Sequence, residues 1–133
     1  MTQWTGPALQ EQVVPWTHID GDAASRRFAD AVASAPRALF SGGTSISGAI
    51  DHAVRLLAAR SPLANAPYTQ VAHAVRRVID VSGDGANNRG RPAAMARDDA
   101  VAAGIVVNGL PILVLEPNLD AHYRDNVIGG PGA

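Results

Sequence analysis

The sequence contains no cysteine. This absence excludes disulfide bonds, thiolate metal sites and a cysteine nucleophile, although it does not identify the compartment in which the protein works. Long apolar runs are absent as well, since no stretch approaches the roughly 18 residues that a membrane span requires. We therefore expect no transmembrane segment in this chain.

An excess of charge of one sign is also lacking. The 11 Lys and Arg residues are balanced by 12 Asp and Glu residues, which gives a net charge of -1. A general nucleic-acid-binding protein needs a basic face to neutralise phosphates, so we expect no nucleic-acid partner. The chain does have 47% hydrophobic residues over 133 positions, which is typical of one folded domain with a modest core.

The hydrophobic pattern predicts alternating strands and helices. Gly6 and Pro7 form a turn between two strand-like arms, residues 1–4 and 12–16, which predicts a hairpin. The other expected elements are helices over residues 22–35, 46–57, 92–103 and 119–127 and strands over residues 74–81 and 105–115. The later alternation of strand and helix indicates an α/β fold with a parallel sheet.

Glycines and prolines mark the breaks in this pattern. Asn108 and Gly109 interrupt the strand over residues 105–115, so we expect a bulge or a shortened strand there. Gly104 is the expected C-cap of the preceding helix. Residues 61–69 hold two prolines and an asparagine, which predicts a surface loop.

A polar loop from Ser82 to Asn88 follows the apolar run that starts at Val78 and ends at Val81. The β-branched run predicts a strand buried on both faces, and Pro92 opens the next predicted helix. Ligands of open α/β sheets bind beyond the carboxyl ends of the strands. This loop is therefore the first candidate for a functional site.

Two familiar loop motifs fit this segment poorly. Asp80, Ser82 and Asp84 have the spacing of the first half of a calcium loop, but Arg91 stands at the twelfth position, where a bidentate glutamate is required. The glycines also lack the Gly-Lys-Ser/Thr ending of a phosphate loop and the spacing of a dinucleotide fingerprint. Neither motif explains the loop.

Catalytic arrangements are equally scarce. The chain has four histidines: His18, His52, His73 and His122. They form no recognisable pair, and no Gly-x-Ser-x-Gly nucleophile elbow occurs, so a surface role is the ordinary interpretation of these histidines. A hydrolase that uses the loop from Ser82 to Asn88 with a nearby histidine stays open as an alternative.

Thr44 and Asp84 form the constellation that we favour. Each lies in a polar loop that precedes a predicted helix, and both loops would lie at the same edge of an α/β sheet. A hydroxyl and a carboxylate are hard oxygen ligands, suited to Mg²⁺, Mn²⁺ or Ca²⁺. The ordinary alternative is that Thr44 only caps the following helix and Asp84 only serves the turn.

Several segments resemble a bacterial family of von Willebrand factor A-like proteins of unknown function. They are residues 13–17, 42–46, 77–88, 107–112 and 123–133. The resemblance implies a doubly wound, mostly parallel α/β fold in a single domain over residues 1–133, with a metal-ion-dependent adhesion site. Thr44 and Asp84 match the threonine and the aspartate with which two loops of that site hold the metal.

The chain departs from the pattern of that family at its first metal-binding element. The Asp-x-Ser-x-Ser motif after the first strand is absent, and its imitation from Asp80 to Asp84 comes after Thr44 rather than before it. We therefore expect a domain that is incomplete at both ends, without the first strand, which would lie beside residues 77–81, and without the last strand and helix. Metal binding would then be weak or absent.

The resemblance also implies a function. The metal would be presented to a partner protein whose carboxylate completes the coordination shell. We therefore expect a metal-dependent, adhesion-type binding module rather than an enzyme, with the hydrolase as the alternative. For the full-length protein the resemblance implies an extracytoplasmic location, although nothing in this chain shows it.

Overall fold

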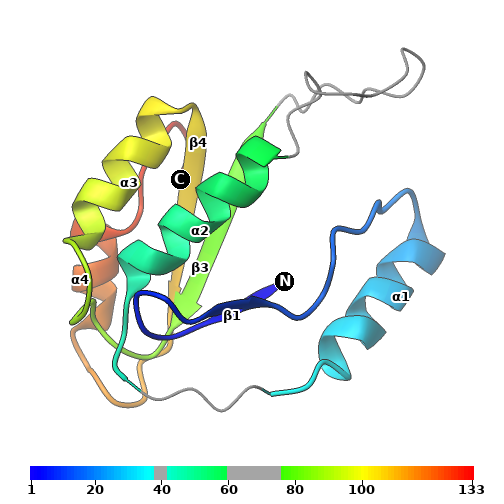
Figure 1. Cartoon of the computed structure of the whole chain (residues 1–133), viewed down its shortest axis with the longest axis horizontal. Coiled ribbons are helices and arrows are strands. Elements are labelled where there is room, and N and C mark those ends of the chain that lie inside the picture. The colour runs from blue at the N-terminus through cyan, green and yellow to red at the C-terminus, as the bar shows by residue number, and fades with distance from the viewer. Residues whose placement is uncertain (38–41, 60–75) are drawn as a thin grey trace.

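The computed structural model describes residues 1–37, 42–59 and 76–133. Helices and strands follow one another in the expected order (Figure 1). They are β1 (Thr2–Trp4), β2 (Gln10–Gln12), α1 (Asp22–Ala33), α2 (Ile46–Ala59), β3 (Arg77–Gly83), α3 (Ala93–Ala102), β4 (Ile105–Pro111) and α4 (Leu119–Asn126). The surface loop expected over residues 61–69 and the histidine at position 73 lie outside the described residues.

The first two strands form the expected hairpin, but its second arm comes earlier than predicted. β1 and β2 pair antiparallel, with Trp4 opposite Gln10. The side chain of Gln10 donates to the carbonyl oxygens of Gly6 and Pro7, at 2.8 and 3.1 Å. Closure of the turn therefore selects a polar segment as the second arm, and the apolar Val14 is buried beyond it.

β3 and β4 pair in parallel, which agrees with the expected α/β class. Their register is one to one from Arg77 opposite Ile105 to Gly83 opposite Pro111. β4 is shorter than the run of residues 105–115, and no bulge interrupts it at Gly109. A Cβ on Gly109 would lie 2.6 Å from Cδ1 of Tyr123, so this glycine admits the ring of α4 against the strand.

The core lies on one face of the parallel pair. Side chains alternate along a strand, and Ile79, Val81, Ile105 and Val107 share one buried cluster with residues of α2, α3 and α4. Figure 1 shows α1 apart from this layer, across the hairpin. Helices on both faces, as a doubly wound fold requires, are not seen in the described residues, so that part of the expectation stays a prediction.

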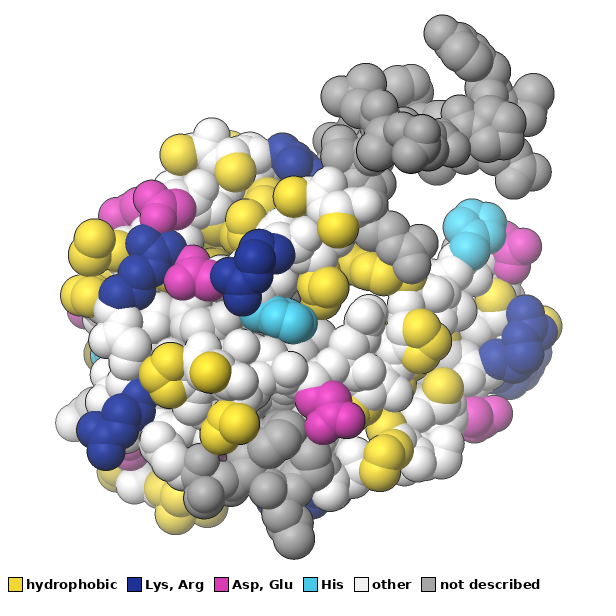
Figure 2. All heavy atoms as spheres, viewed as in Figure 1, with side chains coloured by type: hydrophobic (Ala, Val, Ile, Leu, Met, Phe, Trp, Pro, Cys, Tyr) yellow, Lys and Arg dark blue, Asp and Glu magenta, His cyan; other side chains and the backbone are white. Residues whose placement is uncertain are grey.

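The third helix approaches the sheet closely because its buried side chains are small. Ala93, Ala96 and Ala100 are all at most 4% exposed. Gly104 ends the helix with a φ of 72°, the left-handed conformation expected of a C-cap glycine. Basic and acidic side chains adjoin on the outer surface over α2 and α3 (Figure 2).

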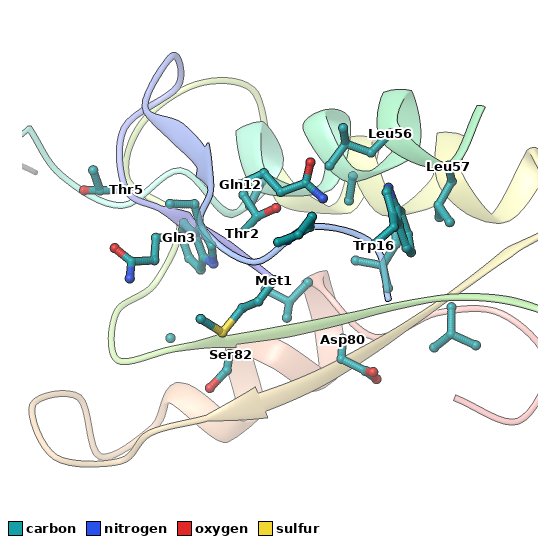
Figure 3. Close-up of a pocket in the computed structure, with 18 of the residues that line it drawn as sticks. Met1, Thr2, Gln3, Thr5, Gln12, Trp16, Leu56, Leu57, Asp80 and Ser82 are labelled. Atoms are coloured by element: carbon teal, nitrogen blue, oxygen red, sulfur yellow. The ribbon is translucent and has the colours of Figure 1, made fainter. Parts of the chain in front are cut away.

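A cavity of about 1160 Å³ lies between the hairpin and β3, with α2 above it (Figure 3). Residues of β1 line one side and residues 78–84 line the other. β3 therefore pairs with β4 on one edge and faces the cavity with the other. This is the place beside residues 77–81 where the resemblance puts a further strand.

The lengths and compositions of the described helices agree with the absence of a transmembrane segment expected from the sequence. None of the helices within the described ranges is both long and apolar enough to cross a bilayer.

Candidate functional site

The structure brings Thr44 and Asp84 to the same end of the parallel pair. Asp84 follows the last residue of β3, and Thr44 lies just before α2. A Cβ built on Gly85 would lie 3.1 Å from Oγ1 of Thr44, and both Thr44 and Asp84 line the cavity beside β3. Two loops that are distant in the sequence therefore meet at the carboxyl end of a central strand.

Backbone contacts fix the position of Thr44. Its N–H donates to Oδ1 of Asn88 at 2.9 Å, and the N–H of Asn88 donates back to the carbonyl oxygen of Thr44 at 2.9 Å. Gly43 adopts a φ of 91°, and a Cβ there would lie 2.7 Å from Oδ1 of Asn88. The reciprocal pair of hydrogen bonds therefore depends on a glycine before the threonine.

Helix capping is performed by the next residue in the chain. The N–H of Gly48 donates to Oγ of Ser45 at 3.1 Å, which is the contact of an N-cap side chain. The hydroxyl of Thr44 makes no hydrogen bond with another described residue. The capping role considered for Thr44 thus belongs to Ser45, and the Thr44 hydroxyl is available to a ligand.

Tyr123 packs directly behind the Asp84 loop. A Cβ on Gly83 would lie 2.9 Å from its hydroxyl and 3.1 Å from the ring of Trp4. Burial raises the pKa of Tyr123 to about 12, and the nearby negative charge of Asp84 adds to this effect. Asp84 itself is exposed, whereas Tyr123 is buried and Trp4 is half-buried.

Glu116 is a third member of the site, and the sequence reasoning missed it. Its Oε2 accepts a hydrogen bond from the N–H of Ala86 at 3.1 Å, and its Oε1 lies 3.6 Å from the position of a Cβ on Gly85. The missing side chain of Gly85 therefore leaves space between the Thr44 hydroxyl and a second carboxylate. The position of Glu116 shortly after β4 could have indicated its membership of the site, because the carboxyl ends of neighbouring parallel strands lie at one edge of the sheet.

Asn87 ties the loop to its surroundings. Its Oδ1 accepts from the N–H of Ser47 at 3.1 Å, and its Nδ2 donates to the carbonyl oxygen of Arg91 at 3.0 Å. Its own N–H donates to Nε2 of His122 at 3.3 Å. The structure thus places a histidine at the loop, but the lone pair of Nε2 already accepts a backbone hydrogen bond.

Comparison with known proteins gives a family for the whole chain. A family model described as "Protein of unknown function (DUF1194)" matches residues 1–133. The chain belongs to the DUF1194 family. No curated protein and no solved structure matched it. For this DUF1194 chain, the relationship to von Willebrand factor A-like proteins therefore stays a prediction.

The calcium-like spacing in this DUF1194 chain does not produce a cluster of ligands. Asp80 accepts a hydrogen bond from Nδ2 of Asn108 at 2.7 Å, across the strand pair. Figure 3 shows Asp80 and Ser82 projecting from β3 on the side away from the α2 leucines. The polar residues of β3 therefore form a cross-strand contact, and only Asp84 joins Thr44.

The other described histidines of this DUF1194 protein contribute nothing to the site. His18 is exposed ahead of α1. His52 is half-buried on α2, its Nε2 has no partner among the described residues, and burial, together with the charge of Arg55, lowers its pKa. The position of His18 fits a surface role, and the position of His52 fits a structural role.

The ligand set offered by the DUF1194 site is small. Among the described residues, no group of three or more His, Cys, Asp and Glu side chains is arranged to hold a metal ion. Thr44, Asp84 and Glu116 offer one hydroxyl and two carboxylates: the hydroxyl and Glu116 adjoin Gly85, and Asp84 is the residue before it. An ion there would need further oxygen ligands from water or from a partner.

Proposed function

We propose that this protein is a metal-dependent protein-binding module of the adhesion type. Thr44 and Asp84 hold a divalent cation, and a carboxylate from a partner protein completes its coordination shell. The observation that carries this proposal is that both residues line the cavity at the carboxyl end of β3, where the Thr44 hydroxyl adjoins Gly85, the residue after Asp84. The capping of α2 by Ser45 adds support, because helix capping then does not explain the threonine at position 44.

The chemistry of the group favours a hard cation. Mg²⁺, Mn²⁺ and Ca²⁺ prefer carboxylate, hydroxyl and water oxygens, and this site contains no nitrogen or sulfur ligand. Glu116 brings a second carboxylate to the loop that carries Asp84, through its contact with the N–H of Ala86. Two carboxylates balance a divalent charge, whereas Asp84 alone would leave half of it uncompensated.

The fold is part of the same proposal. A von Willebrand factor A-like arrangement would place a parallel strand along the free edge of β3, and the cavity of about 1160 Å³ lies there. Such a strand would be followed by the first metal-binding loop of that family. Its absence from this chain gives the physical reason to expect weak metal binding.

Direct observation of the metal is the appropriate test, because stability would hardly respond. If the dissociation constant is about 10 mM, about 1 mM Mg²⁺ stabilises the fold by only about 0.06 kcal/mol. We expect no measurable thermal shift with Mg²⁺. Paramagnetic Mn²⁺ broadens the NMR signals of nearby amides even when it binds weakly.

Titration with Mn²⁺ should broaden the amide signals of Thr44, Gly85 and Glu116 before those of other residues. Asp84→Ala should remove this selective broadening while the remaining spectrum is kept. Asp30→Ala, which removes an exposed carboxylate from α1, is the matched control and should change nothing. Broadening that survives in Asp84→Ala would contradict the proposed site.

A hydrolase that uses the loop from Ser82 to Asn88 is the second candidate. The contact of His122 Nε2 with the N–H of Asn87 favours it, because it places a possible base at that loop. The same contact occupies the lone pair that a general base needs. Ester hydrolysis above the rate in buffer, lost in His122→Ala and kept in Asp84→Ala, would support this function over the binding module.

A further inference from the structure

A run of exposed apolar side chains lies beside the candidate site. Ile112, Leu113, Val114 and Leu115 are 46, 53, 78 and 71% exposed. Single exposed apolar residues are ordinary on protein surfaces, but a contiguous exposed group bordered by polar residues is typical of an interaction site. We call residues 112–115 the apolar rim.

The apolar rim is attached at both ends to the segment that carries Asp84. Its first residue, Ile112, donates its N–H to the carbonyl oxygen of Gly83 at 2.9 Å. Glu116, which follows the rim, accepts the N–H of Ala86 at 3.1 Å. Asp84 lies between these two attachment points, so the rim and the candidate cation have a fixed relative position.

The turn within the rim is ordered by its own backbone. The N–H of Val114 donates to the carbonyl oxygen of Ile112 at 3.0 Å. Leu119, the first residue of α4, donates to the carbonyl oxygen of Glu116 at 3.1 Å. The exposed side chains are therefore held on a short, defined loop between β4 and α4, which is the geometry of a preorganised contact surface.

We propose that the apolar rim and the metal site form one docking surface for a partner protein whose acidic side chain is flanked by apolar residues. This inference rests on the proposed function, in which the carboxylate of the partner binds the cation. The residues on either side of that carboxylate then come to lie against the rim. Burial of Val114 and Leu115 supplies the hydrophobic contribution that a single carboxylate lacks.

Charge and hydrogen bonding distinguish this partner from two other occupants. When the weakly bound cation is absent, Asp84 and Glu116 carry negative charge beside the rim and would repel an anionic membrane surface. In a second copy of the chain, the acidic residue that directly follows the apolar rim is Glu116, and its carboxylate is already held by the N–H of Ala86. A protein with a free acidic side chain between apolar neighbours meets neither obstacle.

The test uses synthetic pentapeptides with uncharged, blocked termini as probes, in the presence of Mg²⁺. The reference peptide is Gly-Leu-Asp-Leu-Gly, one comparison peptide has Asn in place of Asp, and another has Ser in place of both Leu residues. Binding is measured from NMR shift changes at Thr44 and Gly85 in the full chain. The rim variant carries Val114→Ser and Leu115→Ser. Met95→Ser, at a residue of α3 that is 54% exposed and does not line the cavity, is the matched control.

We expect the reference peptide to bind about tenfold more tightly than either comparison peptide, which corresponds to about 1.4 kcal/mol. The rim variant should lose this tenfold advantage while its Mn²⁺ broadening stays as in the wild type, and Met95→Ser should keep both. Equal binding of the Leu and Ser peptides, or no peptide binding with the metal present, would overturn the role of the rim and leave the metal site standing.

Three further outcomes would also overturn the inference. If the wild type self-associates in sedimentation and the rim variant does not, the occupant is a second copy of the chain. If the wild type pellets with phosphatidylcholine vesicles and the rim variant does not, the occupant is a lipid surface. Absence of any selective Mn²⁺ response in the wild type would remove the proposed function together with this inference.

Discussion

Removal of the Tyr123 hydroxyl should stabilise the protein. Tyr123 is 0% exposed, and its hydroxyl has no hydrogen-bond partner among the described residues. A buried polar group left unsatisfied costs about 1–3 kcal/mol, whereas the aromatic ring of phenylalanine keeps the packing against Gly109. We therefore expect Tyr123→Phe to raise the free energy of unfolding by about 1 kcal/mol at pH 7, with a rise in Tm of roughly 4 °C.

The difference should grow in alkaline solution. The pKa of Tyr123 is raised to about 12 in the folded protein, by burial first and by the charge of Asp84 second. An unfolded tyrosine ionises near pH 10, so between about pH 10 and 12 the unfolded state loses a proton that the folded state keeps. The wild type should therefore lose roughly 3 kcal/mol of stability over this range, at about 1.4 kcal/mol per pH unit, and Tyr123→Phe should not.

Urea denaturation followed by circular dichroism at pH 7, 10 and 11 measures both effects. Tyr68 is present in both proteins, so its own ionisation cancels from the comparison. A Tyr123→Phe protein that is less stable than the wild type at pH 7 would show that the hydroxyl is satisfied in solution. Parallel stability profiles up to pH 11 would refute the argument about its ionisation.

Two other predictions concern single residues. Gly43→Ala should destabilise the fold by roughly 1–2 kcal/mol in urea denaturation, because its φ of 91° strains a side chain and a Cβ would meet Asn88. Gly21→Ala, at an extended φ of 166° with nothing within 4 Å of its Cβ position, is the matched control and should be close to neutral. His52 has a lowered pKa, so the unfolded state takes up a proton below about pH 6.5 more readily than the folded state. Stability should fall between pH 7 and 5, and His52→Gln should reduce that fall; an unchanged fall would contradict this cause.

The sequence by itself determined the order of the elements and the α/β class. Hydrophobic periodicity and chain breakers are local signals, and they predicted α1 between Asp22 and Pro36 and the glycine C-cap of α3. The rule that ligands bind beyond the carboxyl ends of parallel strands connects Thr44 with Asp84 from the sequence alone. The resemblance to von Willebrand factor A-like proteins added the expectation of a metal and a protein partner, which awaits the experiments described above.

Only the tertiary structure decided which residues surround these two. The position of Glu116 after β4 could have indicated this edge of the sheet, but only the fold shows that its carboxylate accepts the N–H of Ala86. The burial of Tyr123 and the exposure of the apolar rim have the same origin, since each depends on which distant surface a side chain meets. The course of β4 past Gly109 likewise follows from the ring of Tyr123 on another element, which local propensity does not encode.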